Sequence, residues 1–341
     1  MRQRDVLPLA FDRDDALAAG YSRHQFQRIV AGTDVITVAP RTHAHAVAWL
    51  LAGRVDRHLA LCRVAAGRFS GSTLSHTSAA LWHGLPHPRH VPDAVSLTVD
   101  KARPVGDHQS WVDLQRSRLP ERLVTRVDDV RVTTLDRTAV DCLRTLPAAD
   151  GLAIADRVVR LGVPPSDLVA VRVMQARWPG VRRARWGIGL VDGRRETWLE
   201  SASVAVLDGW GLPVPTPQVD VRDRATGAFI GRVDLMWRAL RVVGEADGRG
   251  KYRGEFDGDT SARAVADRLI AADIRADRLR EVGLGVVRWG SPDLHQPLTL
   301  AQRIRHAEPR GPLRAEMSCA TCRNELDDCS CAPRLFIPAA A

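Results

Sequence analysis

Three acidic residues in the C-terminal third of the sequence have types and spacing that suit metal chemistry. Glu245 and Asp247 stand two residues apart in the run Leu240 to Asp247, and Asp234 belongs to the apolar run before it. Residues i and i+2 of a β-strand share a face, so Glu245 and Asp247 project together while Asp234 arrives from a neighbouring strand. Carboxylates bind hard cations such as Mg²⁺, which activates water for phosphodiester hydrolysis. The sequence therefore predicts a magnesium site at Asp234, Glu245 and Asp247.

Two further residues are candidates for the same catalytic group. Glu200 offers a carboxylate from a preceding helix, and Lys251 offers a cation that stabilises a pentacovalent phosphate electrostatically. The alternative is an ordinary surface, in which strand ends are solvated, Asp247 and the following glycine form a turn, and Glu196 and Glu200 pair with nearby arginines. The spacing alone is compatible with both readings.

Four cysteines near the C-terminus form a second candidate metal site. Cys319 and Cys322 are separated by two residues, and Cys329 and Cys331 by one. Four thiolates are enough for one tetrahedral Zn²⁺. The second spacing is less usual in zinc ribbons, so the alternative is a flexible terminus with free thiols. The pattern predicts a small zinc knuckle or an unstructured tail.

The segment around the acidic residues has a clear order of elements. Glu196 and Glu200 stand at i and i+4 in a predicted helix, which places both carboxylates on one face. Alternating apolar runs predict three strands after it, and a long helical pattern and a late strand follow. The predicted ranges are helix 196–209, strands 218–221, 231–237 and 240–247, helix 260–281 and strand 285–289.

The N-terminal segment has the pattern of a helical DNA-binding element. A short helix over 11–19 ends at Gly20, and Ser22 is a plausible N-cap for a second helix. Apolar residues of that helix recur at i, i+3 and i+4, and the run 35–38 suits a strand of a wing. The outward positions predicted to contact DNA are Arg23, Gln27 and Arg28. The alternative is an ordinary surface helix of an arginine-rich protein.

The chain is predicted to be an α+β multidomain protein, because 341 residues exceed one compact core. The pattern predicts a winged helix in the N-terminal part, a mixed α/β region in the middle and an α/β core in the C-terminal part. Residues 178–195 are rich in arginine and glycine, which suits a linker or a solvated connection into the next domain. The predicted domains are 1–50, 51–180 and 194–307, followed by a cysteine-containing tail at 315–341.

The C-terminal part resembles the endonuclease-like domain related to very-short-patch repair enzymes. The resemblance rests on Glu196-Thr197-Trp198-Leu199-Glu200-Ser201, Gly211-Leu212-Pro213, Gln218, Val233-Asp234-Leu235 and Glu245-Ala246-Asp247-Gly248. It implies a PD-(D/E)xK restriction-endonuclease-like fold, with Asp234 and Glu245 as metal ligands and Glu200 as the helix carboxylate. Asp247 stands where many members of that superfamily have a lysine, and Lys251 can supply the cation from a shifted position.

The N-terminal part resembles the antitoxin domain of the AbiEi type. The matching segments are Asp15 to Gly20, the helix after Ser22, and Ser75 to Leu85. The resemblance implies a winged helix that binds DNA and regulates transcription, with a cognate toxin as a possible partner.

The overall charge also favours a polyanionic partner. The formal net charge is +9, and Lys101 and Lys251 are the only lysines among 49 basic residues. No apolar stretch is long enough to span a membrane, and the N-terminus has no signal-like core, so we expect a cytoplasmic protein with reduced thiols. Two hypotheses follow: a Mg²⁺-dependent DNA endonuclease, or a non-catalytic regulator or antitoxin of the AbiEi type.

Overall fold

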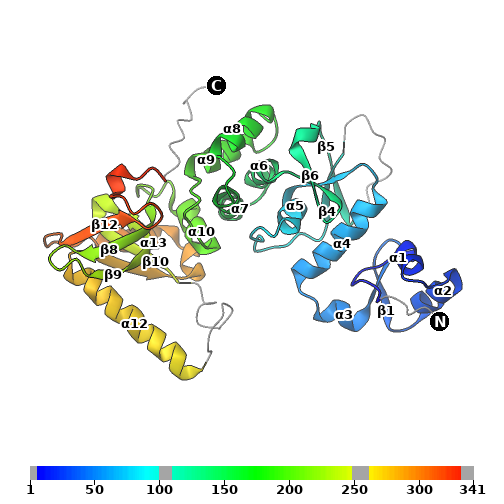
Figure 1. Ribbon diagram of the computed structural model, residues 1–341, viewed down its shortest axis with the longest axis horizontal. Helices are drawn as coiled ribbons and strands as arrows, with labels where there is room; N and C mark the ends of the chain where they lie inside the picture. The colour runs from blue at the N-terminus through cyan, green and yellow to red at the C-terminus, as the bar shows by residue number, and fades with distance from the viewer. Residues whose placement is uncertain (1–5, 100–109, 248–260, 332–341) are drawn as a thin grey trace. The chain divides into compact units, whose positions relative to one another are not determined.

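The computed structural model describes residues 6–99, 110–247 and 261–331 and divides into two compact units. Unit 1 comprises Met1–Thr145 and unit 2 comprises Leu146–Ala341 (Figure 1). Both units combine helices with a mixed β-sheet, as expected for a chain of the mixed α and β class with several domains. The predicted middle region, 51–180, spans the boundary between the two units.

Unit 1 begins with two short helices and a hairpin, followed by a five-stranded sheet with helices. Its helices are α1 (Arg13–Ala18), α2 (Arg23–Ala31), α3 (Ala46–Leu51), α4 (Arg54–Arg68), α5 (His76–Trp82) and α6 (Leu135–Thr145), with a 3-10 turn η1 (Glu121–Leu123). Its strands are β1 (Val35–Ala39), β2 (Thr42–His45), β3 (Thr73–Leu74), β4 (Val95–Val99), β5 (Val112–Arg116), β6 (Val124–Val127) and β7 (Val130–Thr133).

The first two helices form where the sequence predicts them, because each has a side-chain cap. Asp12 accepts hydrogen bonds from two backbone N–H groups at the start of α1, and Ser22 accepts one from Gln25 at the start of α2. Gly20, at φ +87°, makes the turn between them. β1 and β2 then pair as an antiparallel hairpin. The predicted N-cap at Ser22 is confirmed.

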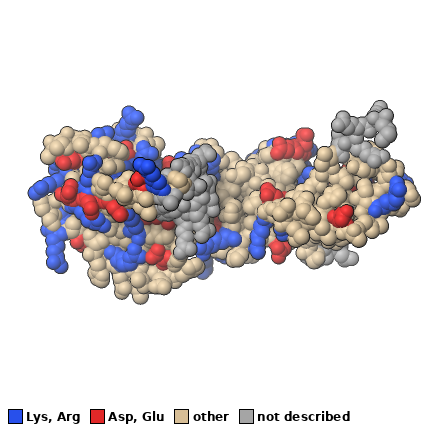
Figure 2. Space-filling model, turned by 90° about the horizontal axis from the view of Figure 1, so that it is seen from below, with Lys and Arg blue, Asp and Glu red and all other residues tan. Residues whose placement is uncertain are grey.

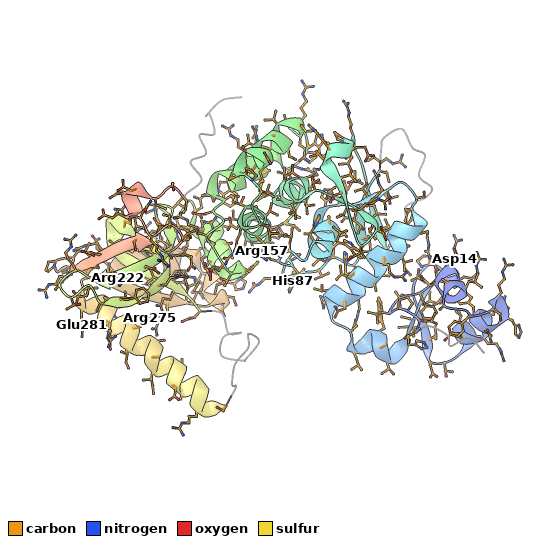
Figure 3. All side chains as sticks on the ribbon, in the orientation of Figure 1. Asp14, His87, Arg157, Arg222, Arg275 and Glu281 are labelled. Carbon is orange, nitrogen blue, oxygen red and sulfur yellow. The ribbon has the colours of Figure 1, made fainter. Side chains whose placement is uncertain are left out.

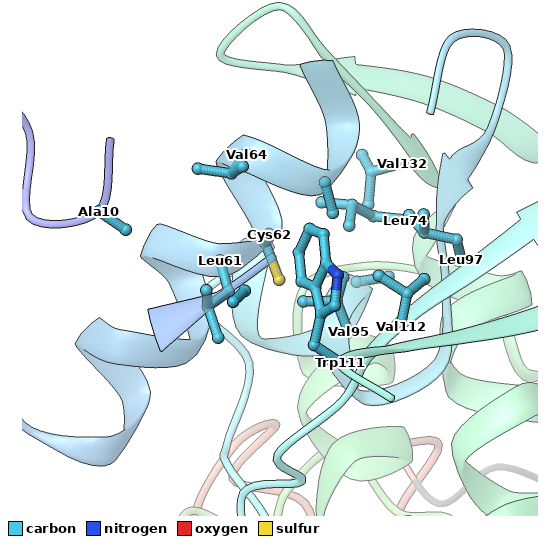
Figure 4. Packing of buried hydrophobic residues seen from close by; sticks show 13 residues of the cluster. Ala10, Leu61, Cys62, Val64, Leu74, Val95, Leu97, Trp111, Val112 and Val132 are labelled. Carbon is cyan, nitrogen blue, oxygen red and sulfur yellow. The ribbon is translucent and has the colours of Figure 1, made fainter. Parts of the chain in front are cut away.

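The core of unit 1 lies between α4 and the larger sheet. The strand order is β5-β4-β3-β7-β6, in which β4 is parallel to β5 and β3 is parallel to β7. Figure 4 shows Leu61 and Cys62 of α4 facing Trp111 and the valines of the strands. Val95 and Leu74 are fully buried in this cluster, so the sheet is held by apolar packing on the α4 side.

Unit 2 consists of a helical part followed by a second five-stranded sheet. Its helices are α7 (Ala148–Arg160), α8 (Pro165–Met174), α9 (Val181–Leu190), α10 (Trp198–Leu207), α12 (Ala262–Glu281) and α13 (Pro297–His306). Its strands are β8 (Thr216–Asp223), β9 (Phe229–Trp237), β10 (Val242–Ala246), β11 (Gly285–Trp289) and β12 (Ala315–Cys319). Short 3-10 turns lie at η2 (Arg238–Leu240), η3 (Ser291–His295) and η4 (Leu326–Asp328).

The linker predicted at 178–195 is wrong, since most of it is the packed helix α9. Ala184 and Ile188, at i and i+4, are buried and give the helix an apolar side. Arg195, which follows α9, is also buried and forms a bidentate ion pair with Asp156 of α7. The apolar pattern of α9 was missed in the sequence because few apolar residues stand among many arginines.

The sheet of unit 2 has the order β11-β10-β9-β8-β12. β8, β9 and β10 are successively antiparallel, β10 and β11 are parallel, and β12 pairs antiparallel with β8. α12 packs on one face of the sheet, and α10 and α13 lie against β10. Gly244 is required on β10, because a Cβ there would lie 2.3 Å from the Trp289 ring. The predicted order of helix, three strands, helix and strand is confirmed.

Helices long and apolar enough to cross a membrane do not occur among the described residues.

Candidate functional site

Glu200 is buried at the first turn of α10, where it organises the start of the helix. Its Oε1 accepts a hydrogen bond from the Thr197 hydroxyl at 2.8 Å, and its Oε2 accepts one from the Glu196 backbone N–H at 2.9 Å. The side-chain amide of Gln218 donates to Oε2 at 3.0 Å. Glu196 precedes the helix, is half exposed and pairs with Arg160. The predicted common face of the two glutamates is therefore wrong, because the helix begins after Glu196.

Gln218 connects Glu200 to the sheet through an unusual backbone. Its φ is +52° within β8, which is the left-handed region that non-glycine residues rarely adopt. Its carbonyl accepts a hydrogen bond from the Ala320 N–H at 3.1 Å. Its neighbours Pro217 and Val219 pair with Leu235 and Val233, so Gln218 stands opposite Asp234. Strained backbone of this kind is concentrated at functional sites.

Asp234 lies next to the strand that carries the other two acidic residues. Its Oδ2 accepts a hydrogen bond from the Ala246 N–H at 2.9 Å. Ala246 stands between Glu245 and Asp247, so β9 and β10 bring the three acidic positions into one neighbourhood of the sheet. This neighbourhood is what the spacing of the sequence predicted.

Glu245 is neutralised by two arginines. Arg275 of α12 donates to Oε1, with an Nη2 to Oε1 distance of 2.8 Å, and Arg288 of β11 donates through Nε to Oε2 at 2.9 Å. The Glu245 side chain is 3% exposed, whereas those of Arg275 and Arg288 are 39% and 26% exposed. Arg275 lies on the part of α12 that runs beside the sheet (Figure 3). We call Glu245, Arg275 and Arg288 the Glu245 cluster.

Further carboxylates surround Arg288. Asp273 accepts a hydrogen bond from its Nη1 at 2.7 Å. Burial opposes the charge of Arg288, but Asp273, Glu245 and Asp247 together raise its pKa above the ordinary value. The cluster and its neighbours are therefore a network of alternating charges around the Arg288 guanidinium.

The acidic residues are close in the sheet but do not converge on one point. Within residues 6–99, 110–247 and 261–331, the four cysteines are the group of three or more His, Cys, Asp and Glu side chains whose donor atoms lie close enough to share an ion. Asp234, Glu245 and Asp247 form no such group, since Asp234 caps Ala246 and Glu245 faces its arginines. Lys251 lies outside the described residues.

The four cysteines are brought together. The Sγ atoms of Cys319, Cys322, Cys329 and Cys331 all lie within 4.8 Å of one another. Burial raises the pKa of Cys319, but the N–H groups of Cys322 and Thr321 point at its sulfur and lower the pKa to about 6. Burial and the neighbouring sulfurs raise the pKa of Cys329 and Cys331. The four sulfurs form one compact group, and this geometry suits a metal site rather than an unstructured tail.

The predicted DNA-contacting side chains lie on the open face of α2. Arg23, Gln27 and Arg28 are exposed, and no residue of α2 is fully buried. Phe26 is half buried and packs edge-on against His43 of β2. In Figure 2, basic and acidic side chains are interspersed over the face shown. The face shown therefore has no single basic patch, and what distinguishes α2 is that none of its residues is fully buried.

The cationic partners of these sites were missed by sequence reasoning. Arg275, Arg288 and Arg194 are three of many arginines, and only the tertiary structure shows which carboxylate or thiol each one meets. One signal was available: β11 carries a charged residue, Arg288, within an otherwise apolar strand. A second missed cluster lies in unit 1, where Asp141 binds Arg137 and Arg144.

Comparison with known proteins gives few relatives. No family model matches the chain. Two Mycobacterium tuberculosis proteins, "Uncharacterized protein MT2308" of strain CDC 1551 / Oshkosh and "Uncharacterized protein Rv2248" of strain ATCC 25618 / H37Rv, are each 27% identical over 174 residues. The match covers 50% of this chain, and it spans 59% of the length of these relatives. The crystal structure of the RV2827C protein from Mycobacterium tuberculosis matches with a TM-score of 0.36 and 16% identity, covering 53% of this chain and 72% of that one.

Proposed function

We propose that this chain is a DNA-binding protein that contacts the duplex through α2 and the β1–β2 hairpin. The observation that carries the proposal is the exposed polar face of α2, whose Arg23, Gln27 and Arg28 point away from the core. A recognition helix needs such a face, because side chains near its start reach base edges and phosphates. The order of helix, turn, helix and hairpin supports the proposed winged helix.

The net charge of the chain supports DNA binding, but it does not identify which surface contacts the DNA. A formal charge of +9 attracts any polyanion, and the charge is spread over both units. Specific contact by α2 can therefore be distinguished from general electrostatic attraction by comparing the DNA affinities of two variants, one without arginines of α2 and one without arginines elsewhere.

The test measures the affinity of the full chain for a labelled DNA duplex by fluorescence anisotropy across a salt series. The duplexes are the region upstream of its own coding sequence and a mixed-sequence control. Arg23→Ala/Arg28→Ala should weaken binding about tenfold or more and reduce the slope of log K against log salt by about 2, since each lost phosphate contact contributes about 0.9. The matched control is Arg177→Ala/Arg182→Ala, which removes two exposed arginines of unit 2.

The control variant should change the affinity less than about threefold, because its arginines make no phosphate contact. Equal losses in both variants would mean that binding follows net charge alone. Unchanged affinity in Arg23→Ala/Arg28→Ala would remove α2 from the interface.

A second candidate function is a Mg²⁺-dependent endonuclease, favoured by the topology of unit 2. The order α10, β8, β9, β10, α12 and β11, with a parallel β10–β11 pair, supports the proposed restriction-endonuclease-like core. Asp234 and Glu245 occupy the central adjacent strands, and the Ala246 N–H joins them. For Mg²⁺ to bind, the Glu245 carboxylate must leave Arg275 and Arg288, whose partly exposed side chains would then turn to a DNA phosphate.

Incubation with supercoiled plasmid and Mg²⁺ or Mn²⁺ tests this candidate. Nicking by the wild-type chain that is lost in both Asp234→Ala and Glu245→Gln would support it. Intact plasmid, together with retained DNA binding, would favour a non-catalytic regulator of the antitoxin type. The binding measurement thus keeps the two candidates apart.

A further inference from the structure

We propose that four thiolates, those of Cys319, Cys322, Cys329 and Cys331, bind one Zn²⁺. Arg194 supports this site by donating hydrogen bonds to the sulfurs of Cys319 and Cys329. The four Sγ atoms lie within 4.8 Å of one another, and those of Cys322 and Cys329 are 3.8 Å apart. Zinc to sulfur bonds of about 2.3 Å in a tetrahedron give sulfur to sulfur edges of about 3.8 Å. The spacing of the sulfurs thus suits one metal ion, and a disulfide bond needs a much shorter distance.

The first pair of cysteines lies in a tight knuckle. Arg323, directly after Cys322, has φ +63°, and its N–H donates to the Cys319 carbonyl at 2.8 Å. The Cys319 N–H donates to the Asn324 carbonyl at 2.9 Å, which closes the turn. The N–H groups of Thr321 and Cys322 point at the Cys319 sulfur. Backbone donors of this kind stabilise the negative charge of a metal-bound thiolate.

The second pair, Cys329 and Cys331, lies at the end of η4 and directly after it, where its sulfurs are close to those of the first pair. Cys329 is the C-cap of η4, and the Cys331 N–H points at its sulfur. The short C-x-C spacing is therefore no obstacle, because each pair has its own backbone donors. Both sulfurs of the buried cysteines, Cys319 and Cys329, face the same arginine.

Arg194 joins the sulfur cluster to the body of unit 2. Its Nη1 lies 3.4 Å from Cys329 Sγ and 3.8 Å from Cys319 Sγ, and its Nη2 and Nε bind Asp192 at 2.6 Å and 2.9 Å. The Arg194 side chain is 7% exposed. A Zn²⁺ with four thiolates carries two negative charges, so a buried guanidinium at this place has a physical reason. The Asp192 N–H donates to Asp156 in turn, which extends the connection to α7.

The metal site also bears on the candidate carboxylate site. β12 ends at Cys319 and covers the edge of β8, and the Ala320 N–H binds the carbonyl of the strained Gln218. Gln218 holds Glu200 through its side-chain amide. Zinc is therefore expected to fix β12 against β8 and to keep Gln218 in its left-handed conformation.

The identity of the metal ion is inferred from the chemistry of its four ligands. Soft thiolates in a tetrahedron select zinc or iron, and zinc is the usual ion of structural four-cysteine sites. The sulfurs of Cys319 and Cys329 are buried, and Arg194 fills the space beside them, which suits a closed structural site rather than an open catalytic one.

The test begins with metal analysis of the full chain purified without added chelator. We expect about one zinc per chain, and the zinc-depleted chain should take up Co²⁺ with the visible bands and the thiolate charge-transfer band of a tetrahedral tetrathiolate. Cys319→Ser/Cys329→Ser should lose the metal. The control Cys142→Ala changes a buried cysteine of unit 1 and should retain it.

Arg194 gives a second readout that does not depend on removing a ligand. Arg194→Met should weaken zinc affinity about 10-fold to 100-fold in competition with a chelator, and Arg194→Lys should recover part of the loss. A wild-type chain without stoichiometric zinc that also fails to form the cobalt spectrum would overturn the proposal, as would iron in the site or zinc retained by Cys319→Ser/Cys329→Ser.

Discussion

A buried carboxylate is held by two arginines in each unit, at Asp141 and at Glu245, but the two clusters differ in how far they are open to solvent. In unit 1, Asp141 binds Arg137 at 2.7 Å and Arg144 at 3.1 Å, and the three side chains are 0%, 2% and 6% exposed. In unit 2, Glu245 is equally buried, but both of its arginines reach solvent. One cluster is closed and the other is open on its cationic side.

This difference separates a structural cluster from one that can exchange partners. A closed cluster has given up the hydration of its charges, so removing one member leaves the others buried with an ion pair lost. In the Glu245 cluster the arginine heads keep part of their hydration, so they can turn outward when an anion or a metal ion arrives. The open cluster is therefore the one that we expect to exchange partners.

The largest effect is expected from breaking the closed cluster. Asp141→Ala leaves the charges of Arg137 and Arg144 in the core of unit 1 and should lower the free energy of unfolding by about 3 to 5 kcal/mol. Urea titration of the full chain, followed by circular dichroism, measures the change. The matched control is Glu121→Ala, which removes an exposed partner of Arg131 in the same unit and should cost less than about 1 kcal/mol.

The comparison fails if Asp141→Ala costs no more than this control. Such a result would mean that the two arginines find other partners or water when Asp141 is absent, and the closed cluster would not be a structural requirement.

A smaller effect is expected at the open cluster. Glu245→Gln keeps the shape of the side chain, and Arg275 and Arg288 can extend to solvent, so the free energy of unfolding should fall by about 1 to 2 kcal/mol. The same urea titration measures it, with Asp277→Asn of the exposed pair with Arg280 as a control expected to stay within about 0.5 kcal/mol. A loss as large as that of Asp141→Ala would show that the Glu245 cluster is also structural, and it would weaken the case for ligand exchange.

The segment of unit 2 from α10 to β11 was predictable because its elements have strong local patterns, whereas α9 was not. The strands β8 to β10 alternate or run apolar, and α12 carries a long helical pattern, so the predicted 260–281 agrees closely with Ala262–Glu281. The neighbourhood of Asp234 and Glu245 follows from this order. In unit 1, the cap at Ser22 is a local signal of the same kind.

What could not be predicted depends on contacts between distant residues. Arg288 is 43 residues from Glu245, and Arg194 is 135 residues from Cys329. Arginine is abundant throughout the chain, so its presence near a site has no local signature. Glu200 likewise accepts a buried hydrogen bond from Gln218, a contact with no local signature in the sequence.

The smallest effect is expected in the pH dependence of the stability that Asp141 contributes to the closed cluster. Burial raises the pKa of Asp141, but the charges of His76, Arg137 and Arg144 outweigh it and hold the pKa below the ordinary value. Because the folded pKa is the lower one, the ionised carboxylate stabilises the fold at all pH values above the unfolded pKa of about 3.9, and this stabilisation is lost as the pH falls through the folded value. The difference in unfolding free energy between wild type and Asp141→Asn should therefore stay constant above about pH 5 and shrink progressively below about pH 4. Urea titrations at a series of acidic pH values measure it, and a difference that stays constant down to the acid limit, or that already shrinks near neutral pH, would contradict the closed, ionised cluster.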